Sequence, residues 1–145
     1  MTIRRAALSD FAAVAYLLEQ LGRERVTHET YAACREIYAA ALDDPNSDHL
    51  VAVDERGNVV GFCSLHYRPR LNRPRPQAWI PDLVVTPAVR GRGTARALLG
   101  EAEGLARDHG CWEVTLESSH EQREAHLLYT AAGMQEVGRA FRKSL

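Results

Sequence analysis

A short apolar run, a turn with two glycines and a helical segment follow one another in residues 83–109, and this order constrains the fold more than any other feature. Leu83-Val84-Val85 is typical of a buried strand, and residues 94–109 have the pattern of an amphipathic helix. Between them lies Arg90-Gly91-Arg92-Gly93-Thr94-Ala95. A strand that passes through a tight turn into a helix is typical of an α/β layered domain.

The turn between this strand and this helix has the composition of an anion-binding site. Backbone N–H groups at a helix N-terminus converge there with the positive end of the helix dipole. Gly91 and Gly93 have no Cβ to obstruct the approach of phosphate oxygens to the backbone. Arg90 and Arg92 add cationic donors. We therefore expect this turn to bind a pyrophosphate.

Two better-known phosphate motifs do not fit the turn. A dinucleotide-binding fingerprint requires a third glycine where Arg96 stands, and a nucleotide-triphosphate loop requires Gly-Lys followed by Ser or Thr. The pattern that remains is Arg-x-x-Gly-x-Ala after a strand that ends in Leu-Val-Val-Thr-Pro. In this setting it resembles the acyl-coenzyme-A loop of the GNAT superfamily of N-acetyltransferases. The alternative is a glycine-containing turn that only starts a helix.

Hydrophobic periodicity and turn residues predict the remaining elements. Strands are expected at residues 2–6, 50–53, 59–65, 77–85, 112–118 and 136–144, and helices at 10–21, 29–43, 94–109 and 124–132. This order predicts one α/β domain over residues 1–145 with a mixed sheet. It is also the order of the GNAT acyl-CoA N-acyltransferase fold, which implies helices on both faces of a mixed central sheet.

A second motif supports the same resemblance. Residues 125–134 read Ala-His-Leu-Leu-Tyr-Thr-Ala-Ala-Gly-Met and are similar to the family's closing motif, Ala-x-x-x-Tyr-x-x-x-Gly-Phe/Met. More narrowly, residues 79–85, 123–129 and 141–145 are similar to aminoalkylphosphonate N-acetyltransferases. The resemblance implies an enzyme that transfers an acetyl group from acetyl-CoA to a primary amine by direct attack in a ternary complex.

The resemblance also implies roles for particular residues. Tyr129 matches the tyrosine that acts as general acid at the thioester sulfur; the alternative is that it belongs to an apolar stripe with Ala125 and Ala132. The strand pairs with the pantetheine amides, and a backbone N–H near Val84 or Val85 polarises the thioester carbonyl. The residues expected to bind acetyl-CoA are Leu83, Val84, Val85, Arg90, Gly91, Arg92, Gly93, Thr94 and Ala95.

Several residues are candidates for the proton acceptor. Many family members carry a glutamate where this chain has Pro81, a residue compatible with the point at which the family's fourth and fifth strands splay apart. Asp82 is the next residue, but strand alternation places its side chain on the face opposite to that of the family's glutamate unless a bulge intervenes. A structural role for Asp82 is an equal alternative. His66, Tyr67 and His126 are further candidates, and the imidazole of the two histidines accepts protons near neutrality. An amine that arrives neutral needs no base.

The acceptor side is suggested by four arginines in the turn at residues 68–76. Arginine binds phosphonate, phosphate or carboxylate groups with paired hydrogen bonds. We therefore hypothesise a small amine acceptor that carries an anionic group, with Arg70, Arg73 and His66 as candidate binding residues. The alternative is a solvated turn whose prolines prevent it from pairing.

Composition argues against several other classes of protein. Eighteen Lys plus Arg balance 19 Asp plus Glu, so no strong field favours nucleic acid. No apolar run is long enough to span a membrane, and no signal segment follows Met1. Three scattered cysteines are typical of reduced thiols in a cytoplasmic protein. His120-Glu121 begins like a zinc-protease helix, but Glu124 stands where a histidine is required, so we expect no metal.

Other functions consistent with the same motifs are a non-catalytic acyl-CoA sensor and an acetyltransferase that acts on protein amines. The family resemblance also implies that the chain forms a homodimer, an expectation by analogy alone.

Overall fold

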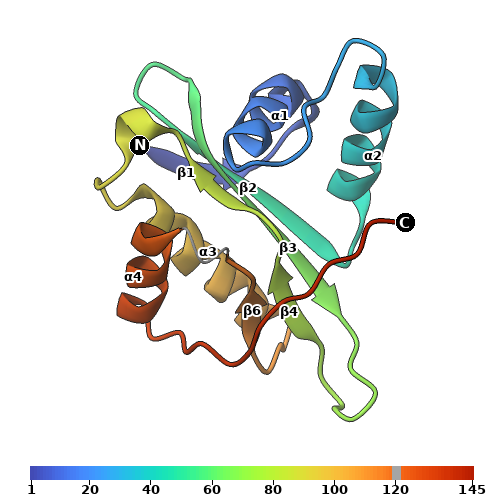
Figure 1. The fold of residues 1–145 in the computed structure, drawn as a ribbon, viewed down its shortest axis with the longest axis vertical. Coiled ribbons are helices and arrows are strands. Elements are labelled where there is room, and N and C mark those ends of the chain that lie inside the picture. The colour runs from blue at the N-terminus through green and yellow to red at the C-terminus, as the bar shows by residue number, and fades with distance from the viewer. Residues whose placement is uncertain (119–121) are drawn as a thin grey trace.

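The computed structural model describes residues 1–118 and 122–145, in which a mixed sheet separates two pairs of helices (Figure 1). The strands are β1 (Thr2–Arg5), β2 (Ser47–Val53), β3 (Val59–Arg68), β4 (Gln77–Ile80), β5 (Leu83–Val85) and β6 (Val114–Leu116). The helices are α1 (Phe11–Gln20), α2 (Tyr31–Asp43), α3 (Thr94–Asp108) and α4 (Arg123–Ala131), with short 3-10 helices η1 (Leu8–Asp10) and η2 (Pro87–Val89). The sheet order is β1-β2-β3-β4-β6, and β5 pairs with β3.

Each face of the sheet buries its own apolar core, because successive side chains of a strand point to opposite faces. Helices α1 and α2 cover one face, where Phe62 of β3 and Val84 of β5 are buried against Val14 and Leu17 of α1. Helix α3 covers the other face, where Cys63 of β3 is buried with residues such as Leu98 and Leu99. The expected α/β fold, a mixed sheet with helices on both faces, is confirmed.

Helix α3 packs closely on the sheet at Gly61 of β3. A Cβ at this glycine would lie 3.0 Å from Leu98 Cδ1 and 3.3 Å from Ala52 Cβ. The absence of a side chain therefore allows the helix that follows the glycine turn to lie directly on β3. This contact fixes the N-terminal half of α3 relative to β5, the strand on which the turn begins.

The expected strand at 77–85 is divided into β4 and β5, which lie one after the other along β3. His66 of β3 faces Trp79, and Cys63 faces Leu83. Two residues of β3 thus lie opposite three residues of the partner chain, which defines a β-bulge around Pro81. Proline has no N–H to donate, so the bulge accommodates it without an unpaired donor.

Beyond the bulge the sheet opens. Strand β4 pairs with β3 on one side and in parallel with β6 on the other, whereas β5, within the described residues, pairs only with β3. One edge of β5 is therefore free. In the described part of the chain, strand β5, which follows β4, is thus not paired with β6 as β4 is. This is the place where the family resemblance predicted that two strands splay apart.

The prediction of a strand at residues 136–144 is wrong. The chain after Gly133 pairs with no strand among the described residues, and Val137 and Phe141 are 88% and 94% exposed. A strand is stabilised by a paired edge and a face that becomes buried, and this segment has neither. Its cationic residues Arg139, Arg142 and Lys143 also favour solvent.

No helix in residues 1–118 and 122–145 combines the length and apolar character that a membrane span requires.

Candidate active site

A groove of about 1060 Å³ lies between β5, the start of α3 and α4. We call it the α3–α4 groove. It brings the glycine turn together with Tyr129, two motifs that are well separated in the sequence. Its lining includes all the residues expected to bind acetyl-CoA apart from Arg92: Leu83, Val84, Val85, Arg90, Gly91, Gly93, Thr94 and Ala95.

The glycine turn presents backbone donors at the end of this groove. Gly91 and Gly93 have φ values of +74° and +82°, a region that residues with a Cβ rarely adopt. A Cβ at either position would meet no heavy atom within 4 Å, so the glycines are required by backbone conformation and the space beside them is open. Gly93 is the N-cap of α3. Among the described residues, the N–H groups of residues 91–93 donate to no backbone carbonyl.

The free edge of β5 supplies a second set of backbone groups. Ser64 N–H donates to the Asp82 carbonyl, and Thr86 N–H donates to the Val60 carbonyl, both at 2.9 Å. In an antiparallel ladder, residues of one strand alternate between facing the partner and facing away. Val84 therefore directs its N–H and carbonyl toward β3, whereas Leu83 and Val85 direct theirs toward the free edge.

Tyr129 approaches β5 from α4 and packs against the core under α3. Burial raises the pKa of its phenol above the ordinary value, and the nearby Cys63 thiol raises it further. The phenol is therefore neutral and able to donate a proton or hydrogen bond throughout the physiological range. Cys63 is itself fully buried, and burial raises its pKa to about 12, which leaves the thiol unreactive.

Asp82 lies on the opposite face of the sheet from Tyr129, because the bulge at Pro81 shifts the alternation by one residue. Its Oδ2 accepts a hydrogen bond from Ser64 Oγ at 3.4 Å. Its Oδ1 accepts one from Arg23 Nε at 2.8 Å, and Arg23 Nη2 donates to the Pro81 carbonyl at 2.8 Å. Arg23, in the α1–α2 connection, was not predicted from the sequence, where nothing marked it among other exposed arginines.

Two histidines lie on the same face as Asp82. The ring of His66 lies 5.8 Å from the ring of Trp79 and 5.6 Å from that of His49. His49 is buried, stacks on Phe62 and hydrogen-bonds Ser47 Oγ through Nε2, while its Nδ1 has no partner among the described residues. Burial lowers its pKa, and proximity to His66 lowers it further. Alternate residues of a strand lie on the same face, so the sequence alone could have placed Ser64 and His66 of β3 together.

The turn at residues 68–76, which we call the arginine turn, lies at the other end of the sheet from the glycine turn at residues 90–95 (Figure 1). Gln77, where β4 begins, is five residues from Asp82, roughly 16 Å along an extended strand. Arg73 lies over the Trp112 ring, 4.1 Å from its centroid. Arg70 and Arg73 do not line the α3–α4 groove. A role for either arginine in acceptor binding stays a prediction.

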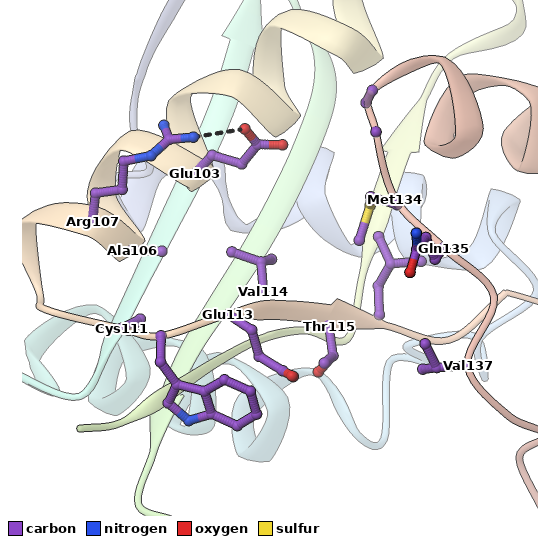
Figure 2. Close-up of a pocket in the computed structure, with 14 residues that line it drawn as sticks. Glu103, Ala106, Arg107, Cys111, Glu113, Val114, Thr115, Met134, Gln135 and Val137 are labelled. Atoms are coloured by element: carbon purple, nitrogen blue, oxygen red, sulfur yellow. Dashed lines mark ion pairs between the residues drawn. The ribbon is translucent and has the colours of Figure 1, made fainter. Parts of the chain in front are cut away.

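A second cavity, of about 510 Å³, lies between α3, β6 and the chain that follows α4. Figure 2 shows Val114 and Met134 among the side chains that line it. Glu103 and Arg107 of α3 form an ion pair there at 3.5 Å. None of the predicted catalytic or acetyl-CoA-binding residues is among the described residues that line it. We therefore assign the candidate active site to the α3–α4 groove and the adjoining bulge.

The described residues contain no group of three His, Cys, Asp or Glu side chains arranged to hold a metal ion. His120 and Glu121, the start of the zinc-protease-like pattern, lie outside the described residues.

Comparison with known proteins identifies this arrangement. The model of the "Acetyltransferase (GNAT) family" matches residues 11–134, which include the bulge, the glycine turn and α4. The chain belongs to the GNAT family of acetyltransferases. Membership of this family makes it an N-acetyltransferase, as the two sequence motifs implied.

Among GNAT relatives, the aminoalkylphosphonate N-acetyltransferase of Salmonella typhimurium is 33% identical over 143 residues, which cover 99% of this chain and 90% of that protein. A putative acetyltransferase from Agrobacterium tumefaciens is 26% identical and superimposes with a TM-score of 0.85 over the full length of both chains. The structure of AAC(6')-Iy with the bisubstrate analogue CoA-S-monomethyl-acetylneamine has the same fold, with a TM-score of 0.80 and 22% identity over 99% of this chain and 98% of that chain.

Proposed function

We propose that this GNAT protein binds acetyl-CoA in the α3–α4 groove and transfers the acetyl group to the primary amine of a small acceptor. The observation that carries the proposal is the convergence of three features in one groove: unpaired backbone donors of the glycine turn, the free edge of β5 and the phenol of Tyr129. These residues fit the acetyl-CoA molecule, whose diphosphate, amide-containing arm and thioester present matching chemistry.

In this proposal the glycine turn holds the diphosphate. The N–H groups of residues 91–95 and the side chain of Arg90 supply donors at the positive end of the α3 dipole. The free edge of β5 pairs with the pantetheine arm through the backbone groups of Leu83 and Val85. Val84 pairs with β3 and buries its side chain in the core, so it offers no backbone donor at the free edge.

The thioester then lies at the opening beside the bulge, between Tyr129 on one face and Asp82 on the other. The acceptor nitrogen forms a bond to the thioester carbonyl carbon, and the carbon–sulfur bond breaks. Asp82 accepts the proton that the nitrogen loses, and Tyr129 donates a proton or hydrogen bond to the departing sulfur. A backbone N–H at the free edge, that of Val85 or Leu83, stabilises charge on the carbonyl oxygen.

Holding the two substrates together supplies much of the acceleration. Correct positioning of two reactants contributes about 7–11 kcal/mol to lowering a bimolecular barrier. The groove and the bulge meet at the opening of the sheet, so a carrier in the groove and an amine on the α1–α2 face approach each other from opposite sides. This geometry supports direct transfer in a ternary complex.

The acceptor class is proposed from the relatives and from charge. The 33%-identical Salmonella protein is named for aminoalkylphosphonates, small amines that carry an anionic group. We propose an acceptor of this kind, a short amine with a phosphonate, phosphate or carboxylate.

The test is thiol release from acetyl-CoA with a panel of amines: aminoalkylphosphonates, amino acids, polyamines and aminoglycosides. The proposal predicts release with at least one short anionic amine. Coenzyme A binding without thiol release for any amine would instead favour a non-catalytic acyl-CoA sensor.

A further inference from the structure

The bulge carries a pair of opposite charges at the mouth of the active site. Arg23 reaches from the α1–α2 connection to Asp82 Oδ1 and to the Pro81 carbonyl, with both hydrogen bonds at 2.8 Å. The side chain of Arg23 is 51% exposed and that of Asp82 is 19% exposed. The pair is thus accessible to a solute, although it lies next to the strand edge that the acetyl donor is proposed to occupy.

Within residues 1–118 and 122–145, neither member of the pair uses all of its hydrogen-bonding capacity. A guanidinium carries five N–H donors, and Arg23 directs two of its nitrogens at the bulge. A carboxylate accepts up to about four hydrogen bonds, and Asp82 receives one strong bond from Arg23 and one long bond of 3.4 Å from Ser64. A cation and an anion with free capacity therefore stand side by side.

We propose that the Arg23–Asp82 pair is the acceptor-recognition site and that it selects zwitterionic amines with a short spacer. This inference rests on the proposed acetyl transfer. The ammonium group of the acceptor binds Asp82, which takes one proton from it and releases that proton to solvent before the nitrogen attacks, and the anionic group binds the remaining N–H donors of Arg23. Because the two protein charges are adjacent, the acceptor charges are separated by only two or three carbon atoms.

The location explains why Arg23, rather than Arg70 or Arg73, meets the anionic group. Asp82 faces the α1–α2 side of the sheet together with Ser64, and Arg23 approaches from that same side. The arginine turn begins roughly 16 Å away along the strand. A short acceptor that places its nitrogen at Asp82 cannot span that distance, whereas Arg23 is already in contact with the carboxylate.

The experiment compares matched acceptors in the full-length protein. Initial rates of thiol release are measured with 2-aminoethylphosphonate, with β-alanine and with the neutral amine ethanolamine, for wild type, Arg23→Gln, Arg23→Lys and Arg25→Gln. Arg25 lies in the same connection but pairs weakly with Glu19 at 3.9 Å, which makes it the control for loss of a loop arginine. Thermal unfolding midpoints and coenzyme A affinity establish that each variant is folded.

Wild type is expected to prefer the two zwitterions over ethanolamine in kcat/KM. Arg23→Gln is expected to raise the KM for the zwitterions by roughly 10–100-fold, the effect of losing a hydrogen bond to a charged group, and to change the KM for ethanolamine by a much smaller factor, because ethanolamine has no anionic group. The KM of Arg23→Lys for the zwitterions is expected to lie between those of wild type and Arg23→Gln. The KM of Arg25→Gln is expected to match that of wild type. The two zwitterions distinguish phosphonate from carboxylate recognition.

Two results overturn the inference and leave the proposed function standing: equal use of zwitterionic and neutral amines by wild type, or a loss in Arg23→Gln that is the same for all three acceptors. No thiol release with any amine by a wild-type protein that binds coenzyme A overturns both the inference and the proposed function.

Discussion

Trp79 and Asp82 lie on the same face of the sheet although Asp82 is three positions after Trp79 in the sequence. In a regular strand an odd separation places two side chains on opposite faces. Here the extra residue at Pro81 restores them to one face: Trp79 lies opposite His66, and Asp82 contacts Ser64. The bulge therefore turns a carboxylate toward the side from which the acceptor is proposed to approach, while Tyr129 stays on the other side.

The first prediction concerns Asp82 as the proton acceptor. Asp82→Asn keeps the shape of the side chain but removes its charge and most of its basicity. We expect kcat to fall by about 10²-fold, the lower end for general base catalysis, with the KM for acetyl-CoA changed by less than about threefold. Steady-state rates of thiol release check this.

The matched control is Glu117→Gln. Glu117 is on the same face and accepts a hydrogen bond from Trp79 Nε1 at 2.8 Å. If Glu117→Gln lowered kcat as much as Asp82→Asn, the assignment of the base to Asp82 would be wrong.

The second prediction concerns Tyr129. Tyr129→Phe retains the packing of the ring and removes the donor to the departing sulfur. Burial raises the pKa of Tyr129, so the phenol keeps its proton at neutral and mildly alkaline pH. We expect kcat to fall by roughly 10–100-fold, by the same factor at about pH 7 and about pH 9. Tyr16→Phe, at a 60% exposed position, serves as control and should leave kcat unchanged. An unchanged kcat in Tyr129→Phe would mean that the ring only fills the core.

The third prediction concerns the glycine turn. Gly93→Ala forces a residue with a Cβ into a backbone conformation at φ +82°, which costs about 1–2 kcal/mol and shifts the turn away from its donor geometry. We expect the affinity for coenzyme A, measured by fluorescence competition, to fall by about tenfold. Gly100→Ala, inside α3 with open space around it, is the matched control and should bind coenzyme A normally. Equal affinity in the two variants would exclude the turn as the diphosphate site.

The fourth prediction is a pH dependence of stability that originates at His49. The pKa of this histidine is lowered from 6.5, mainly by burial and also by His66. Its neutral form is therefore favoured in the folded state, and the unfolded state binds the proton first as the pH falls. The resulting stability is fully present above about pH 6.5 and is lost as the pH drops below it.

His49→Phe should preserve the stack on Phe62 and remove this titration. Urea unfolding between about pH 5 and about pH 7.5 should give a flatter dependence of unfolding free energy on pH for the variant than for wild type. His28→Gln, at an exposed position, is the control and should follow wild type. Parallel curves for His49→Phe and wild type would contradict the prediction.

Much of the fold followed from patterns that are local in sequence. The glycine turn, the helix at 94–108 and the hairpin of β2 and β3 each have a periodicity or a turn residue that needs no distant partner to be recognised. The final strand did not follow, because a strand depends on an edge to pair with, and the alternation in residues 136–144 carries no information about whether that edge is occupied.

The acceptor side illustrates the same limit. Clustering in the sequence directed attention to Arg70 and Arg73, whereas the guanidinium that contacts Asp82 belongs to Arg23, which lies far from it along the chain. Long-range contacts of this kind depend on how the α1–α2 connection folds over the sheet. The sequence alone indicated only that a bulge would change the face on which Asp82 lies. A proline in a strand indicates that pairing is interrupted, but it does not show by how many residues the register shifts.

The most direct measurement of the central claim is calorimetric titration of the wild-type protein with coenzyme A and, separately, with pantetheine, which lacks the diphosphate. If the glycine turn and the free edge of β5 bind the two parts of the acetyl carrier, coenzyme A will bind at one site per chain and pantetheine will bind at least about tenfold more weakly. An absence of heat with coenzyme A at millimolar concentration, or equal affinity for the two compounds, would contradict the account.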